Sequence, residues 1–425
     1  MTATVMILVF LVLMTLGTPI GFSMGLAAVV AIAAFESAPL ILLPQLFYTS
    51  IDNFSLLAIP LFVFAGALMG LSGITEQLVA LARSLVGHLR GGLAQANVLT
   101  NTFMSAISGS AAADVAAVGS IMIPAMTRAG YDKPFAVAVT SSAAMLAPII
   151  PPSIIAVIYS SVTGVSVGKL FIAGVIPGII CAMAIMLLTW YYALRAGTPR
   201  DTKATFAQRG RAIVVAGPAL LMPVLVLGGI LGGIFTATEA GALACVYALI
   251  YCLFRMRTGA SAFYEAVMES AITTGTALVV LAGAALFSWV LVRTGSSAAM
   301  MNMIMGVSNN PHVVMALVLG MLFFVGIVME PIPALVLTGP LLVTAANAMN
   351  FDPLSFGIAV IMMLIVGSVT PPVGVLAMIA CRIAKIPYSS TFRVIIPFTL
   401  VWLAVIALIA YVPSIANFLP SLLTE

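Results

Sequence analysis

The chain has 425 residues, of which 63% are hydrophobic and only 7% are charged. Soluble domains carry about 25% charged residues, so these few charges exclude a water-covered surface and indicate an integral membrane protein. The mean hydropathy of +1.25 agrees with this assignment. The net charge of +4 is small and does not indicate a nucleic-acid partner.

Long apolar segments predict an all-α protein, since about 20 residues cross the hydrocarbon core as a helix. In chain order, the expected spans lie near 3–17, 19–35, 53–71, 134–163, 170–194, 212–230, 236–255, 273–292, 353–383 and 391–413. No basic residue precedes the first span, and its hydrophobicity continues past Gly17, so we expect no cleaved signal peptide.

Two further apolar segments, 92–127 and 311–347, are interrupted by polar or helix-breaking residues at Ser108–Ser110 and Met329–Pro331. We interpret each segment as a re-entrant helical hairpin with its tip at membrane depth. Irregular backbone is tolerated there only where it is buried in protein or lines a cavity. The alternative is two ordinary spans per segment. We consider it the weaker interpretation, because two crossings and a turn need more residues than either segment has.

An internal repeat relates the two halves of the chain at a constant shift of 220 residues. Ala147–Pro152 corresponds to Gly367–Pro372, and Tyr131-Asp132 corresponds to Phe351-Asp352. Weak internal symmetry of this kind is typical of secondary transporters. The sequence therefore predicts a first repeat over 1–195, a linker over 196–211 and a second repeat over 212–425.

The distribution of basic residues predicts the topology. If the hairpins do not cross the membrane, all of the 16 lysines and arginines except Lys169 and Arg293 fall on the side of the linker. Cytoplasmic loops carry such an excess, so we expect a cytoplasmic linker and both termini outside. Five spans per half then invert the second repeat, so that hairpin 92–127 enters from the cytoplasm and hairpin 311–347 from outside.

A Pro-Pro pair lies inside each of the spans 134–163 and 353–383. Proline removes a backbone donor and clashes with the preceding turn, so each pair breaks its helix and frees backbone carbonyls. Freed carbonyls suit Na⁺, and half-helix N-termini attract an anionic substrate. We expect each hairpin tip to face one break, which gives two cation sites with the substrate between them. A kink that serves packing alone is the alternative.

Polar residues within the apolar segments are further candidates. Ser105, Ser108 and Ser110 offer hydroxyl ligands, although such serines often only bond a neighbouring helix. The acidic residue Asp114 follows the first tip by one turn, and Glu330 lies on the second tip; charges at such positions are costly and often functional. Glu239 begins a span and is better explained as a helix cap.

Motifs for other energy sources and for catalysis are missing from the sequence. There is no Walker A motif, so we expect no direct use of ATP. No nucleophile and base are paired, so we do not expect an enzyme. The four cysteines lie in apolar runs without metal-ligand spacing.

Several motifs taken together resemble the large membrane subunit of TRAP transporters, the tripartite ATP-independent periplasmic family. In order they are Ser-Gly-Ser at 108–110, Ala-Asp-Val-Ala-Ala-Val-Gly at 113–119, Ile-Ile-Pro-Pro-Ser at 149–153, Phe-Thr-Ala-Thr-Glu-Ala at 235–240, Met-Glu-Pro at 329–331 and Thr-Pro-Pro-Val-Gly at 370–374. The resemblance covers essentially the whole chain.

This resemblance implies Na⁺-driven import of an organic acid, such as a C4-dicarboxylate or sialic acid, across a bacterial inner membrane. It implies an elevator mechanism, a separate small four-helix membrane subunit and a periplasmic substrate-binding protein. A stand-alone ion-coupled anion carrier or antiporter of similar fold is the alternative function.

The resemblance also implies site residues. It places Na⁺ ligands at Ser105, Ser108, Ser110, Ala147, Ile150, Pro152, Gly326, Glu330, Gly367, Thr370 and Val373. Of these, Ala147 and Val373 would contribute only backbone. The implied substrate-side residues are Ser108, Asp114, Ser153 and Glu330.

Overall fold

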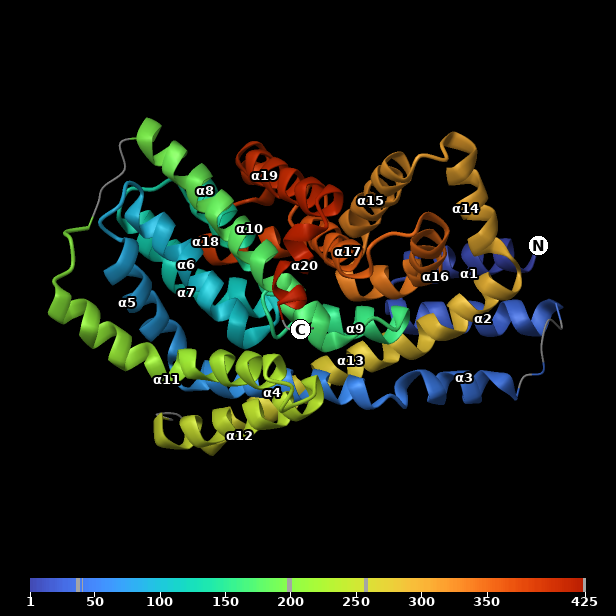
Figure 1. Cartoon of the computed structure of the whole chain (residues 1–425), viewed down its shortest axis with the longest axis horizontal. Helices are drawn as coiled ribbons and strands as arrows, with labels where there is room; N and C mark the ends of the chain where they lie inside the picture. The colour runs from blue at the N-terminus through green and yellow to red at the C-terminus, as the bar shows by residue number, and fades with distance from the viewer. Residues whose placement is uncertain (36–38, 40, 197–200, 256–258, 423–425) are drawn as a thin grey trace.

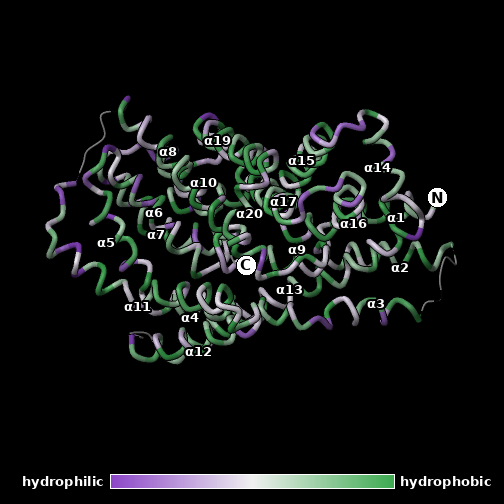
Figure 2. The backbone as a smooth tube through the Cα atoms, viewed as in Figure 1, coloured by the Kyte–Doolittle hydropathy of each residue, from purple (hydrophilic) through white to green (hydrophobic). Residues whose placement is uncertain are grey.

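The computed structural model describes residues 1–35, 39, 41–196, 201–255 and 259–422. These residues form helices and connecting segments without a β-strand, which confirms the predicted all-α class. Within them, eight helices are long and apolar enough to cross a membrane. Hydrophobic residues run along most of the helices, and hydrophilic residues gather at the end of the molecule where α5 and α11 meet (Figure 2).

One group of helices, here called the frame, lies along the lower and right sides of Figure 1. Within it α13 packs against α2, α3 and α4, and α12 packs against both α4 and α11. The frame consists of α1 (Thr2–Thr15), α2 (Ile20–Phe35), α3 (Leu42–Ile51), η1 (Phe54–Leu57), α4 (Ala58–Leu71), α11 (Phe206–Leu231), α12 (Ala237–Arg255) and α13 (Ala260–Arg293).

A second group, here called the core bundle, lies above the frame in Figure 1. It consists of α6 (Gly92–Ser108), α7 (Ala111–Arg128), α8 (Lys133–Ala144), α9 (Ile154–Thr163), α10 (Val167–Ala196), α15 (Pro311–Val328), α16 (Pro331–Met349), α17 (Pro353–Gly367), α18 (Val375–Ala384), η2 (Tyr388–Thr391), α19 (Phe392–Tyr411) and α20 (Ser414–Ser421). Two short helices, α5 (Ile74–Val86) and α14 (Ser296–Val307), link the frame to the first and the second hairpin.

The two halves of the chain interlock inside the core bundle. The hairpin α6–α7 packs against α8 of its own half and α18 of the other half. The hairpin α15–α16 packs in the same way against α17 and α9. Each hairpin therefore contacts the first part of one broken helix and the second part of the other, which brings both tips toward both breaks.

The hairpins and breaks lie where the sequence predicts them, to within two residues at each end. Local signals explain the boundaries: Ser110 caps α7 through the N–H of Ala113, and Asp352 caps α17 ahead of Pro353. The length argument against two ordinary spans is wrong for the second hairpin, because α15 and α16 have 18 and 19 residues and each could cross a membrane by length and composition.

Three boundaries in the frame and linker differ from the expectation. Helix α3 lies between the predicted spans 19–35 and 53–71, where no helix was expected. Helix α13 begins at Ala260 rather than near residue 273. Helix α11 begins at Phe206, inside the predicted linker, because Thr205 and Gln208 form a capping box there. Residues 197–200 of that linker lie outside the described residues.

Candidate functional site

Both hairpin tips and both helix breaks line one cavity of about 170 Å³. The first tip contributes Gly109 and Ser110, and the second contributes Glu330 and Pro331. The breaks and the frame complete the wall with Pro148, Ile154, Ile155, Ile365, Ser368, Val375, Leu376, Ile59, Thr273 and Ala277, among others. This central cavity is the place where the predicted tips and breaks meet.

The first tip touches the first break directly. Gly109 adopts a left-handed conformation with φ of +61°, and a Cβ atom there would lie 2.6 Å from the carbonyl oxygen of Pro152. Only glycine combines this backbone conformation with so close an approach. Beside it, the Ser110 hydroxyl accepts a weak hydrogen bond from the N–H of Ala113, at 3.4 Å, and so starts α7 next to the cavity.

The second tip is joined to the second break through two glycines. A Cβ atom on Gly367 would lie 2.1 Å from the carbonyl carbon of Gly326, so the backbones of α15 and α17 are in contact there. Glu330 is the N-cap residue of α16, but its side chain makes no capping hydrogen bond and is exposed. Its carboxylate is therefore free to face the cavity that it lines.

Unpaired backbone carbonyls occur at both breaks, as the prolines predict. Among the described residues, no N–H or hydroxyl group donates to the carbonyls of Ala147, Ile150 or Pro152 in the first break, nor to that of Thr370 in the second. The Gly367 carbonyl differs, because it accepts a hydrogen bond from the N–H of Thr370 at 3.1 Å. Carbonyl oxygens that have no donor can bind an alkali cation.

Asp114 does not face the central cavity, although it lies one turn after the tip. It is fully buried, and the hydroxyl of Ser108 donates to its Oδ1 atom at 2.5 Å. Its Oδ2 atom has no partner among the described residues. Ser105 is also fully buried, and its hydroxyl donates to the Asn101 carbonyl at 2.7 Å. This cluster lies inside the first hairpin, so the structure does not support substrate contact by Asp114 here.

Other predicted residues also have local roles. The Ser153 hydroxyl donates to the Pro148 carbonyl at 2.5 Å and accepts from the N–H of Ala156, so it caps α9 and is buried away from the central cavity. The Thr370 hydroxyl donates to the Val366 carbonyl at 2.8 Å. Val373 is 38% exposed and does not line the central cavity.

Sequence analysis missed the contribution of the frame. Thr273 and Ala277 of α13 and Ile59 of α4 form one wall of the central cavity. These helices lie far from the tips in sequence, and none of the three residues belongs to a motif that we recognised. Thr273 is the one polar residue of the three, and its hydroxyl is the only sequence signal for this wall.

A second cavity of about 360 Å³ adjoins the central one, and the two share Ser110, Ile154 and Thr273 as lining residues. It runs between α4, α7 and α13, past Glu265 and Glu269. These two acids lie in the first turns of α13, which the sequence analysis did not assign to a helix.

The comparisons with known proteins agree over nearly the whole chain. Residues 7–415 match the family described as tripartite ATP-independent periplasmic transporter, DctM component. The sialic acid TRAP transporter large permease protein SiaM of Vibrio cholerae is 34% identical over 407 residues, which cover 96% of this chain and 95% of that protein.

A longer relative and a solved structure extend the comparison. The isethionate TRAP transporter permease protein DctMQ of Oleidesulfovibrio alaskensis is 36% identical over 96% of this chain, which spans only 65% of that protein. The crystal structure of the Alcanivorax borkumensis YdaH transporter is similar in fold, with a TM-score of 0.58, 14% identity and 89% of each chain covered.

Proposed function

The chain belongs to the DctM components of the tripartite ATP-independent periplasmic transporters, and we propose that it imports a small organic acid together with Na⁺ by an elevator mechanism. Relatives are named for sialic acid and for isethionate, which are both anions of small organic acids. Permeases move a solute without changing its covalent bonds, so the chain acts as a carrier and not as an enzyme.

The observation that carries the proposal is the meeting of two tips and two breaks around one cavity. The unpaired carbonyls of Ala147, Ile150 and Thr370 supply oxygen ligands of the kind that Na⁺ prefers. The N-terminal ends of α7 and α16 border the same cavity, and helix N-termini favour an anion. One cation at each tip would bind the unpaired carbonyls, and the acid between the tips would interact with the helix N-termini.

Two contacts near helix ends support the inverted topology that belongs to this proposal. The excess of basic residues on the linker side, here called the charge rule, assigns both Arg83 and Asp201 to the cytoplasm. These two residues form a salt bridge at 3.0 Å. The Tyr411 hydroxyl donates to the His312 carbonyl at 2.9 Å, and both residues are assigned to the outside. In this arrangement the hairpins re-enter from opposite sides of a bacterial inner membrane, and both termini are periplasmic.

The family description names a tripartite, periplasmic system. We therefore expect a small four-helix membrane subunit and a periplasmic binding protein as partners, with the binding protein selecting the acid. A stand-alone carrier or antiporter is the alternative function. It predicts full uptake by this chain alone, without either partner.

Uptake into proteoliposomes tests the coupling. With both partners present, uptake of N-acetylneuraminate, isethionate or succinate should require an inward Na⁺ gradient and depend on Na⁺ concentration sigmoidally, because two cations bind per cycle. A proton gradient in Na⁺-free buffer serves as the control. Equal uptake under that condition would rule out Na⁺ coupling.

A further inference from the structure

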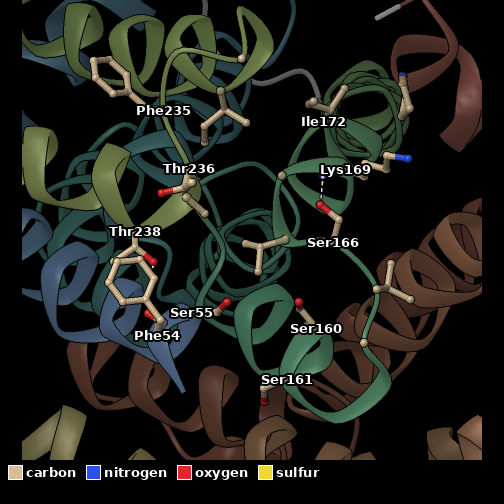
Figure 3. A pocket seen from close by; sticks show the side chains of 18 of the residues that line it. Phe54, Ser55, Ser160, Ser161, Ser166, Lys169, Ile172, Phe235, Thr236 and Thr238 are labelled. Carbon is tan, nitrogen blue, oxygen red and sulfur yellow. Dashed lines mark hydrogen bonds between the residues drawn. The ribbon is translucent and has the colours of Figure 1, made fainter. Parts of the chain in front are cut away.

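A large pocket with both polar and apolar lining lies between the core bundle and the frame, away from the central cavity. Its volume is about 710 Å³. The corner between α9 and α10 forms one wall, and the segment before η1 and the loop between α11 and α12 form the other (Figure 3). The charge rule assigns all of these segments to the outer face of the membrane.

Hydroxyl groups dominate the polar lining of this outer pocket. Ser160 is only 9% exposed, and its hydroxyl has no hydrogen-bond partner among the described residues. The Ser55 hydroxyl also has no such partner, and both groups face the interior of the pocket (Figure 3). Neither hydroxyl is engaged by the protein, so both can hydrogen-bond to water or to a polar molecule in the pocket.

Lys169 is the only charged residue among those that line the outer pocket. It is one of only two basic residues that the charge rule assigns to this face, and its ammonium group has no partner among the described residues. In Figure 3 its side chain extends along the rim, away from the floor where Ser55 and Ser160 lie. The carboxylate of Glu239 accepts hydrogen bonds from the N–H and the hydroxyl of Thr236, which also lines this pocket. The Lys169 side chain is flexible, so its ammonium group can bind a carboxylate that also accepts hydrogen bonds from the hydroxyls of Ser55 and Ser160.

Two helices connect the outer pocket to the central cavity. Ser160 of α9 lines the outer pocket, whereas Ile154 and Ile155 of the same helix line the central cavity. Likewise, Ser55 of η1 lines the outer pocket, and Ile59 at the start of α4 lines the central cavity. A separation of five residues along a helix is about 8 Å, and α9 packs against α4 in this region.

We propose that the outer pocket is a separate binding site for the carboxylate of a small organic acid, with Lys169 supplying the charge and Ser55 and Ser160 the hydroxyl groups. This inference rests on the proposed import of an organic acid. The acid occupies this site at the outer face before the contact between α9 and α4 opens toward the central cavity.

The test measures modification of Ser160→Cys in a chain whose four native cysteines are replaced by alanine. An anionic and a cationic methanethiosulfonate reagent of similar size are added to the outer face, without Na⁺ and without partners. The ratio of the anionic to the cationic rate should fall at least about fivefold when Lys169→Gln is added, since a flexible lysine that swings to within about 4 Å of a bound reagent contributes about 1 kcal/mol in water. Arg293→Gln, the other basic residue of this face, should leave the ratio unchanged.

The second arm adds N-acetylneuraminate or succinate as probes. At least one acid should slow the modification when Lys169 is present, and this protection should disappear in Lys169→Gln. A rate ratio that Lys169→Gln leaves unchanged, or protection by neither acid, overturns the proposed site. The modification involves no transport, so failure of Na⁺-dependent uptake would reject the proposed function without changing these rates.

Discussion

At the scale of single residues, Asp114 is the most unusual group in the chain. It is a fully buried acid with one hydroxyl donor, and its second oxygen is unpaired among the described residues. A buried carboxylate is costly unless a positive charge compensates it. A Na⁺ ion at the first tip would provide that charge, and we predict that Asp114 is an electrostatic partner of this cation rather than a substrate contact.

The variant Asp114→Asn tests this role. Asparagine keeps the shape and can still accept from Ser108, but it removes the charge. Saturating Na⁺ at about 100 times its Kd stabilises a protein by about 2.7 kcal/mol, and we expect Asp114→Asn to lose most of this Na⁺-dependent rise in Tm. Glu239→Gln is the matched control and should keep the rise. A full Na⁺ response in Asp114→Asn would show that the carboxylate does not stabilise the cation.

The hydroxyls of Ser110 and Thr370 are predicted to belong to different cation sites. Because the Thr370 hydroxyl donates its proton to Val366, its oxygen lone pairs stay available to a cation. We expect Thr370→Ala to raise the Na⁺ concentration for half-maximal transport about tenfold, as loss of a contact to a charged group costs on the order of 1.5 kcal/mol. Thr370→Ser should restore it.

Ser110 needs a different control because it also caps α7. Replacing a capping serine by alanine costs about 1 kcal/mol of stability, whereas glycine costs only a few tenths. Ser110→Gly should therefore keep the Tm and still raise the Na⁺ requirement. Normal Na⁺ curves for both Ser110→Gly and Thr370→Ala would mean that backbone carbonyls alone form the cation sites.

Sequence patterns predicted which residues lie near the tips better than they predicted the direction in which the side chains point. Ser110 and Glu330 line the central cavity as expected, whereas Asp114 and Ser153 turn into the bundle. A motif shows that a residue is close to a break, but the helical face that it occupies depends on the packing partners. Thr273 could not be assigned for the same reason, since its position in the cavity depends on how the frame packs on the core bundle.

At the scale of elements, the contact between α15 and α17 depends on two glycines. We expect Gly367→Ala to lower the Tm strongly, because its methyl group would lie 2.1 Å from the Gly326 carbonyl carbon and force the helices apart. Overpacking of this kind costs typically 1–3 kcal/mol. Gly320→Ala, in the same helix α15, has nothing within 4 Å of its Cβ position and should be neutral or slightly stabilising. Equal Tm values for the two variants, measured in detergent, would contradict the close contact.

The elements of the core bundle were predictable because proline, serine and aspartate mark their boundaries. The frame was less predictable, for physical reasons. Helix α3 has only 10 residues and contains Pro44, so its apolar residues do not form a segment long enough to predict a span. The first turns of α13 carry Glu265 and Glu269, which line the second cavity. These two charges lower the mean hydropathy of the segment, so the sequence predicts a later start of the helix.

At the scale of the whole molecule, the interlocked halves suggest which parts move together. Helices α9 and α16 come from different halves, yet a Cβ atom on Gly339 would lie 3.8 Å from the Cβ of Val162. The core bundle therefore holds both tips and both breaks in one unit. The core bundle also packs on the frame, through α16 against α13, through α6 and α9 against α4, and through α10 against α11. An elevator mechanism requires the contacts within the core bundle to persist and the contacts between the core bundle and the frame to change.

Pairs of cysteines can separate these two kinds of contact. Val162→Cys with Gly339→Cys links α9 to α16 within the core bundle, at a Cβ distance typical of disulfides. Gly168→Cys with Ile230→Cys links the core bundle to the frame, because a Cβ atom on Gly168 would lie 3.3 Å from a methyl group of Ile230. After oxidation, the first pair should retain most Na⁺-driven uptake, whereas the second should abolish it until a reductant is added.

The two pairs serve as each other's control, because both introduce two cysteines and one crosslink. Crosslinking yield, measured by a gel shift with a thiol-reactive polymer, shows that each bond has formed. If the pair Gly168 and Ile230 is fully crosslinked and uptake continues at its reduced-state rate, the core bundle does not slide along α11. If the pair Val162 and Gly339 blocks uptake, the tips and breaks must instead move relative to each other, as local gates within a stationary bundle.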